Sequence, residues 1–149
     1  MAFIPKTPFL ATDGIIEVYE GMTFKGIVLI KRKNEPVGLA LPGGFVEVGE
    51  RVEEALVREM KEETNLDVTI IGILDVYSDP KRDLRFHTAS VVYIASAEGK
   101  PRGGDDAIEA IIYDLDDIPL DQLVFDHAKI INDYLHLKKN EKAFFAKQL

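Results

Sequence analysis

The segment GGFVEVGERVEEALVREMKEETNLDV, residues 43–68, decides the fold of this chain. Two glycines open it, a short loop follows, and the remainder predicts a helix. Wound at about 100° per residue, this helix places apolar side chains on one side and most of its charged side chains on the other. Glu59 and Glu63 break that division because they fall within the apolar arc, with Glu62 at its edge.

The spacing of these glutamates is i,i+3 and i,i+4, so their like charges crowd one patch of the helix. Burying an unpaired carboxylate beside apolar groups costs on the order of several kcal/mol unless a cation neutralises it. Mg²⁺ takes carboxylate oxygens, keeps several waters and leaves room for phosphate oxygens. The pattern therefore predicts a metal platform. Taken alone, the run REMKEE is also compatible with an ordinary salt-bridged helix in which Arg58 pairs with Glu62.

The residues around the helix resemble the signature of the Nudix family, a fixed spacing of glycine, glutamate, arginine and paired glutamates. The matching positions are Gly44, Glu50, Arg58, Glu59, Met60, Glu62, Glu63 and Leu66. Asn65 stands where the family has glycine. Because Asn tolerates the left-handed backbone conformation that ends such a helix, we expect the helix to end there all the same.

This resemblance implies an α/β fold, the Nudix-type α/β/α sandwich with a mixed sheet. The length of the chain indicates a single domain over residues 1–149. It also implies hydrolysis of the diphosphate in a nucleoside diphosphate derivative, with Mg²⁺, or Mn²⁺ in its place, as cofactor. The metal ligands that it implies are Glu59, Glu62, Glu63 and the Gly43 carbonyl, with Arg58 orienting Glu59.

A further carboxylate is expected to take a proton from the attacking water. Asp106, in the loop before a predicted strand at 110–114, is the candidate, and Glu109 is the alternative. An Asx turn followed by a solvated strand start is the competing interpretation of this acidic segment.

Candidate substrate contacts lie outside the signature. Arg82 and Arg85 belong to the loop DPKRDLRFH, residues 79–87, whose arginines would hold an anionic or ribosyl part of a substrate. Arg32, at the end of a β-rich run, and Phe125, before the last helix, complete the set. Each also has a structural interpretation. A solvated strand end is favoured for Arg32, and packing at the helix start is favoured over base stacking for Phe125.

Alternating and continuous apolar runs predict the remaining elements. Strands are expected at 13–20, 25–33, 66–77 with a bend near Gly72, and 88–97, and a last helix is expected from Asp126, which would cap it. The middle of the second run is apolar on both faces, which indicates a central strand. Phe144 and Phe145, near the end of the chain, would either lie on the surface or dock on a partner subunit.

The stretches YSDPKRDLRFHT, GGDDAIEA and LVFDHAKII, together with Pro80, resemble small microbial ADP-ribose pyrophosphatases. That likeness implies ADP-ribose as substrate, with AMP and ribose 5-phosphate as products. Two alternatives stay open. One is a sanitising pyrophosphohydrolase of modified nucleoside triphosphates or dinucleoside polyphosphates, and the other is a non-catalytic Nudix domain that senses a nucleotide.

The composition of the chain limits the kinds of molecule that it can bind. A formal net charge of −8 over 149 residues argues against binding a nucleic acid polymer, because the phosphate backbone would be repelled. The absence of Cys excludes disulfides and thiolate metal sites. No apolar run has the length of a membrane span, so we expect a cytoplasmic protein that binds a small molecule and no membrane. A homodimer is common in the subgroup that the chain resembles.

Overall fold

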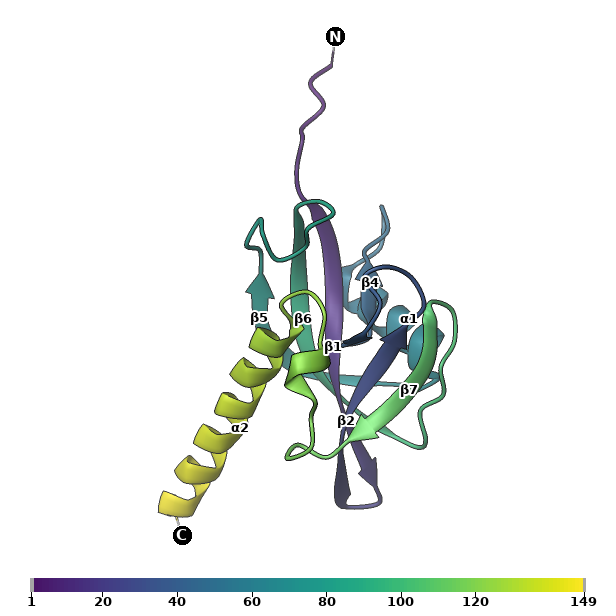
Figure 1. Ribbon diagram of the computed structural model, residues 1–149. Helices are drawn as coiled ribbons and strands as arrows, with labels where there is room; N and C mark the ends of the chain where they lie inside the picture. Colours follow the sequence, from purple (N-terminus) through teal and green to yellow (C-terminus); the bar gives the residue numbers. More distant parts are fainter. Residues whose placement is uncertain (1, 149) are drawn as a thin grey trace.

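The computed structural model describes residues 2–148, and side chains are described through residue 141. Figure 1 shows a sheet with one helix on each side. The strands are β1 (Phe9–Glu20), β2 (Thr23–Arg32), β3 (Leu39–Ala40), β4 (Gly43–Phe45), β5 (Thr69–Tyr77), β6 (Thr88–Glu98) and β7 (Ala107–Tyr113). The helices are α1 (Val52–Thr64), η1 (Leu120–Gln122, a 3-10 turn) and α2 (His127–Gln148). Phe144 and Phe145 lie outside the described side chains.

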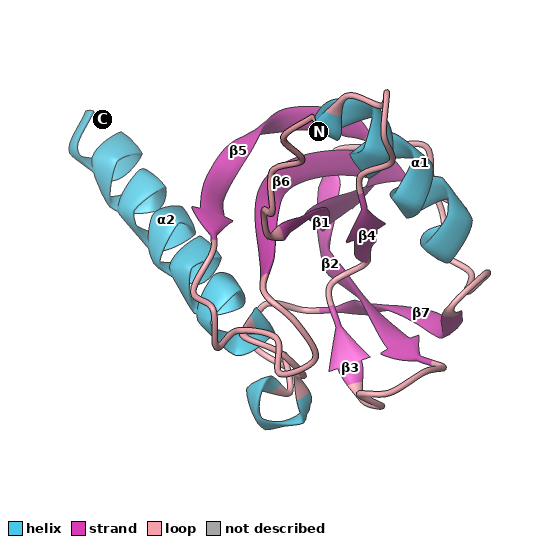
Figure 2. Cartoon of the chain, turned by 90° about the horizontal axis from the view of Figure 1, so that it is seen from above, coloured by secondary structure: helices cyan, strands magenta, loops and turns pink. Residues whose placement is uncertain are grey.

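The sheet is mixed, as predicted. β1 and β6 run parallel over residues 9–19 and 88–98, and the other pairs are antiparallel. β1 and β2 pair only near their hairpin, at residues 17–20 and 23–27, and then diverge. The segment 39–45 fills the gap, because β3 pairs with the end of β2 and β4 pairs with the start of β1 (Figure 2). This divergence makes room beside β1 for β4, the start of the signature segment.

The sheet has an apolar core on each face, which explains why the middle of β2 is apolar on both sides. Ile27 and Leu29 pack with α2, whereas Val28 between them packs with α1. Fully buried Ile130, Ile131 and Tyr134 form the inner side of α2, and Leu56 and Met60 form the inner side of α1. The layer order helix, sheet, helix confirms the predicted fold class.

Most predicted elements are present, with shifted ends. The bend predicted near Gly72 is confirmed by irregular pairing of β5 with β6 between Ile70 and Gly72. β7 begins at Ala107 rather than Ala110, because Ala107 already pairs with Arg32 of β2. Asp126 does precede the last helix, but its carboxylate pairs with a distant arginine, described below.

Helix α1 ends as predicted at Asn65, which takes the left-handed conformation with φ 60° and ψ 17°. Its backbone N–H donates to the Lys61 carbonyl at 3.0 Å. Its side-chain Nδ2 donates to the Arg102 carbonyl at 2.7 Å and so ties the helix end to the loop before β7. Asn65 therefore does what the family glycine would do and adds a tertiary hydrogen bond.

We predict that Asn65→Ala destabilises the protein by about 1–2 kcal/mol, because Ala pays the left-handed penalty and also loses the hydrogen bond to Arg102. Asn65→Gly should cost less, since glycine adopts this conformation freely. Urea unfolding of the two variants and the wild type measures both effects. An Asn65→Ala variant as stable as Asn65→Gly would contradict this account of the helix end.

Candidate active site

A cavity of about 400 Å³ opens where β1 and β2 diverge. Its walls come from β1, the end of β2, β4, the inner side of α1, and three loops at residues 82–85, 105–106 and 125–127. Elements distant in sequence therefore meet at this cavity, next to the segment 39–45, which lies in the gap between β1 and β2.

Glu63 is the most buried carboxylate of the helix wall, with 3% of the residue exposed. Its Oε1 accepts a hydrogen bond from the Gly43 N–H at 2.7 Å, which joins α1 to β4. Burial raises the pKa of this carboxyl to about 8, and the nearby carboxylates of Glu59, Asp13 and Asp106 add to the shift. Near neutral pH, the Glu63 carboxyl would therefore be charged only if a cation were bound beside it.

Glu59 lies one helical turn before Glu63, and 13% of its side chain is exposed. Its carboxylate lies so close to Gly44 that a side chain at position 44 would force this flexible end of Glu59 to move. Burial raises the pKa of Glu59, although Arg58, whose Nη1 donates to Oε1 at 2.9 Å, acts in the opposite direction. Gly44 therefore lets the Glu59 carboxylate keep its place beside β4.

Arg58 does not line the cavity, but its hydrogen bonds connect the elements next to it. Its Nε and Nη2 donate to the two oxygens of Glu50 at 2.7 and 2.9 Å, and Nη2 also reaches the Phe45 carbonyl at 3.1 Å. The hydrogen bonds to Arg58 lower the pKa of Glu50 to about 2. Arg58 thus joins the loop 45–50 to the helix and donates to Glu59, and its role in orienting Glu59 for a metal stays a prediction.

The two other predicted acidic residues differ in position. Glu62 does not line the cavity; its side chain is 39% exposed and lies 3.3 Å from Arg58. Asp106 does line it, and its Oδ1 accepts from Nδ2 of Asn34 at 3.2 Å. The arrangement places Glu59, Glu63 and Asp106 around one space and leaves Glu62 at its outer edge.

The helix wall has the chemistry of a divalent cation site. Buried Glu63 and half-buried Glu59, both with raised pKa values, offer oxygen ligands, and their removal from water makes the charged forms costly without a cation. Within the described residues, no three Asp, Glu or His side chains are already gathered as ligands around one point. The residue types fit a hard cation, and binding one would require these side chains to adjust.

The cavity floor contains polar residues that sequence reasoning did not assign to the site. Asp13 of β1 is buried and accepts a hydrogen bond from the Ser90 hydroxyl of β6. His127 is buried beside it, and its Nδ1 accepts the Leu41 N–H at 2.9 Å, so the ring proton resides on Nε2. Nε2 lies 3.9 Å from Asp13. Burial lowers the pKa of His127, which keeps the ring neutral.

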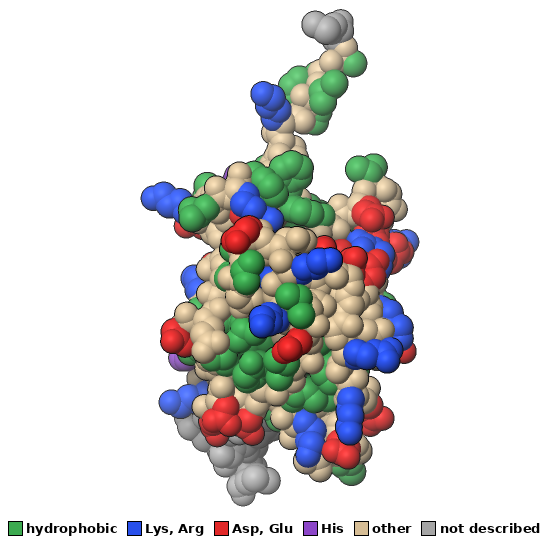
Figure 3. All heavy atoms as spheres, turned by 45° about the vertical axis from the view of Figure 1, so that its right-hand side comes forward, with side chains coloured by type: hydrophobic (Ala, Val, Ile, Leu, Met, Phe, Trp, Pro, Cys, Tyr) green, Lys and Arg blue, Asp and Glu red, His purple; other side chains and the backbone are tan. Residues whose placement is uncertain are grey.

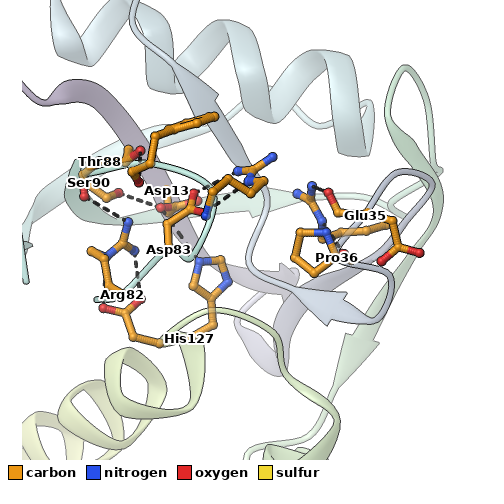
Figure 4. Close-up of polar contacts among 12 residues, drawn as sticks. Asp13, Glu35, Pro36, Arg82, Asp83, Thr88, Ser90 and His127 are labelled. Carbon is orange, nitrogen blue, oxygen red and sulfur yellow. Dashed lines mark hydrogen bonds and ion pairs between the residues drawn. The ribbon is translucent and has the colours of Figure 1, made fainter. Parts of the chain in front are cut away.

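Three predicted arginines line the cavity, but they are held differently. The Arg82 side chain is 5% exposed, and its Nε and Nη2 donate to both oxygens of Asp126 at 2.9 and 2.8 Å. Figure 4 shows Arg82 beside Thr88 and Ser90 at one end, Glu35 and Pro36 at the other, and Asp13, Asp83 and His127 between them. Arg82 is thus engaged in joining the loop 79–87 to α2.

Arg32 and Arg85 are more available to a ligand. Arg32 is half-buried and, among the described residues, bonds only to backbone carbonyls, with its Nε donating to that of Pro36 at 2.8 Å. Arg85 is partly exposed and pairs with Asp83 at 2.9 Å. Both guanidiniums lie over the ring of Phe125, at 5.0 and 5.2 Å from its centroid. Stacking of a base on Phe125, the less favoured sequence interpretation, would compete with these contacts.

An aromatic cluster borders the cavity. Phe9, Phe45 and Phe86 are each partly exposed, with ring centroids 4.9–5.9 Å apart, and Phe45 lines the cavity itself. In Figure 3, hydrophobic side chains gather where the N-terminal segment leaves the body of the protein, next to mixed acidic and basic side chains. The cavity therefore combines charged walls with an apolar edge.

The sequence profile of the NUDIX domain family matches residues 9–134. The chain therefore belongs to the Nudix family, whose hydrolases use divalent metals. Its relatives include the ADP-ribose pyrophosphatase of Methanocaldococcus jannaschii, which is 52% identical over 134 residues, or 88% of this chain and 75% of that protein.

Solved structures give the same fold. The MutT/nudix family protein from Enterococcus faecalis aligns with a TM-score of 0.77 and 31% identity, over 89% of this chain and 62% of that one. The bifunctional NMN adenylyltransferase/ADP ribose pyrophosphatase from Francisella tularensis, crystallised with AMP and a Mn ion, aligns with a TM-score of 0.75 and 30% identity, over 88% and 42%. This chain thus spans less than two thirds of either crystallised protein.

The described part of the chain contains no helix long and apolar enough to cross a membrane.

The raised pKa of Glu63 predicts a pH dependence of stability in the metal-free protein. In the folded state the pKa of Glu63 is about 8, whereas the ordinary pKa of a glutamate, which the unfolded chain has, is 4.5. The folded state thus holds more protons in this window, so the stabilisation from protonated Glu63 is full below pH 4.5 and is lost as pH rises through 8. In urea unfolding with EDTA present, the free energy of unfolding should fall less between pH 4.5 and 8 for Glu63→Gln than for the wild type. Equal slopes would show that Glu63 titrates normally.

Proposed function

We propose that this protein hydrolyses ADP-ribose to AMP and ribose 5-phosphate in a reaction that requires Mg²⁺. The observation that carries the proposal is one cavity lined both by carboxylates, half-buried Glu59 and buried Glu63, and by the basic residues Arg32 and Arg85. Carboxylates that need a cation and guanidiniums that need an anion together suit a metal-bound diphosphate. The name of the 52% identical M. jannaschii relative supports ADP-ribose as the substrate.

In this proposal Glu59 and Glu63 hold the metal, with Glu62 and the Gly43 carbonyl as further ligands. The bound metal would polarise phosphoryl oxygens and lower the pKa of water. The Gly43 N–H orients Glu63, and Arg58 orients Glu59. These contacts fix the two carboxylates before a substrate arrives.

Proton transfer is assigned to Asp106. Its Oδ1 is occupied by Asn34, so Oδ2 is the oxygen that would accept a proton from the attacking water. The water oxygen forms a new bond to one phosphorus, and the bond from that phosphorus to the bridging oxygen breaks. Arg82, Arg85, Arg32 and Phe125 remain the proposed substrate contacts, with Arg82 acting mainly through its ion pair to Asp126.

One assay distinguishes ADP-ribose hydrolysis from the two alternatives, hydrolysis of other nucleotides and nucleotide sensing without catalysis. The purified protein is incubated with Mg²⁺ and, separately, ADP-ribose, dinucleoside polyphosphates and modified nucleoside triphosphates, and the products are identified. AMP released chiefly from ADP-ribose supports the proposal, and preferred turnover of a triphosphate or polyphosphate overturns the choice of substrate. No turnover of any compound would favour a nucleotide-sensing domain.

We predict that Glu63→Gln lowers kcat for ADP-ribose by at least about 100-fold. Removing a residue that only supports a metal ligand costs up to about 100-fold, and removing a ligand itself should cost as much or more. Glutamine keeps the oxygen that accepts the Gly43 N–H, so the fold should persist, as circular dichroism would show. Glu98→Gln, at the exposed end of β6, is the matched control and should leave kcat unchanged. Full activity of Glu63→Gln would remove Glu63 from the metal site.

Three further sequence predictions belong to this proposal. They are a single domain over residues 1–149, a cytoplasmic location and a homodimer. The exposed aromatic cluster of Phe9, Phe45 and Phe86 is compatible with self-association. Sedimentation analysis of the purified chain decides the oligomeric state.

A further inference from the structure

The short connection from β3 into β4 is held by three hydrogen bonds that run to three different elements. The Leu41 N–H donates to Nδ1 of His127, the first residue of α2, at 2.9 Å. The Pro42 carbonyl accepts a backbone N–H of β1 at 2.9 Å. The Gly43 N–H donates to Glu63 of α1 at 2.7 Å. Three successive residues therefore connect α2, the sheet and α1.

The hydrogen bond between Leu41 and His127 is buried and has no substitute nearby. Leu41 is 2% exposed and His127 is 3% exposed, so neither partner is open to water. Among the described residues, no backbone carbonyl accepts the Leu41 N–H, because Leu41 lies between the two strands. A buried N–H without an acceptor is costly. The ring nitrogen of His127 therefore determines where this peptide group is stable.

The position of the His127 ring is set by the packing of α2. Ile130 and Ile131, one turn further along the helix, are fully buried in the apolar cluster that also contains Leu41. The His127 N–H donates to the Val124 carbonyl at 3.2 Å, which fixes the start of the helix. The packed helix thus holds the ring, and the ring holds the connection.

The second nitrogen of the ring makes no hydrogen bond among the described residues. Nε2 lies 3.9 Å from the carboxylate of Asp13, which is beyond hydrogen-bond distance. Figure 4 shows the His127 ring pointing from the start of α2 toward Asp13. The polar contact that this ring makes in the structure is therefore the one to Leu41.

We infer that His127 is a positioning residue for the metal site, because it holds the Leu41 N–H and, through Pro42, the Gly43 peptide group. Gly43 supplies the N–H that orients Glu63 and the carbonyl that is proposed as a metal ligand. The inference rests on the metal site of the proposed function and adds to it a residue that acts through the backbone. Groups that hold a metal ligand in place raise the affinity for the metal.

The test compares His127→Leu with His127→Asn, because leucine and asparagine have nearly the same shape. Asparagine places an oxygen where Nδ1 lies and can accept the Leu41 N–H, whereas leucine cannot, and both changes remove Nε2. Electron paramagnetic resonance of free Mn²⁺ measures the affinity for the metal. His127→Leu should bind Mn²⁺ about tenfold more weakly than the wild type. His127→Asn should keep most of the affinity. His136→Leu, at an exposed position of α2, is the control and should bind as the wild type does.

Amide hydrogen exchange in EDTA gives a second readout, which involves no metal. In His127→Leu, the amides of Leu41 and Gly43 should exchange faster than in His127→Asn. The amides of β6, which lies between β1 and β5, should exchange alike in the two variants. A residue with only a general structural role would instead speed exchange throughout the sheet when it is replaced, and that result would contradict the inference.

A His127→Leu protein that folds and binds Mn²⁺ as tightly as His127→Asn overturns the inference. If His127→Leu does not fold, His127→Gln decides, because its amide oxygen lies one carbon farther from the backbone than the oxygen of asparagine. Weakened Mn²⁺ binding by that variant supports the inference, and unchanged binding overturns it.

The outcomes also separate this inference from the proposed function. A wild type that binds Mn²⁺ but leaves ADP-ribose intact, with binding weakened in His127→Leu, would refute the proposed activity alone. Hydrolysis of ADP-ribose by the wild type, with equal Mn²⁺ affinity in His127→Leu and His127→Asn, would refute the role of His127 alone. A wild type that binds no Mn²⁺ would overturn both.

Discussion

The burial of the Glu63 carboxylate against the Gly43 N–H is the constraint on which the rest of this structure depends. A carboxyl group is buried this deeply at lower cost where a backbone N–H donates a hydrogen bond to it. β4, which runs along the gap between β1 and β2, provides that donor. The close approach explains the second glycine, since Gly44 leaves room for the Glu59 carboxylate. The signature residues therefore also take part in the packing of the helix against the strand.

The sequence predicted what depends on local spacing. The inward glutamates, the left-handed Asn65 and the strand that is apolar on both faces all follow from residues a few positions apart, and all are present. Contacts between residues that are distant in sequence were not predicted. The bonds of His127 to Leu41 and of Ser90 to Asp13 join residues 86 and 77 positions apart, and nothing in a local pattern pairs them. An aspartate at the start of a buried strand was the one available signal.

The same reasoning separates the arginines. Composition alone made Arg82 and Arg85 equivalent members of a charged loop. Folding places Arg82 against Asp126, 44 residues away, and pairs Arg85 with Asp83, its own neighbour. Arg82 therefore contributes chiefly to the position of the loop relative to α2, whereas Arg85 stays at the cavity surface. A charge count cannot make this distinction, because it depends on which carboxylate each guanidinium meets in space.

The two glutamates of the helix wall are neutralised by different means, and this bears on how a metal would enter. Glu59 has Arg58 beside it, so part of its charge is balanced by the protein itself. Glu63 has only a backbone N–H and faces other carboxylates, so in the metal-free protein its charge is removed by a proton. A divalent cation bound there would replace that proton, and metal binding and proton release would be coupled at one side chain. Arg58, held outside by Glu50, can keep orienting Glu59 while this exchange takes place. The outer ion pair thus preserves the geometry of the wall as the charge within it changes.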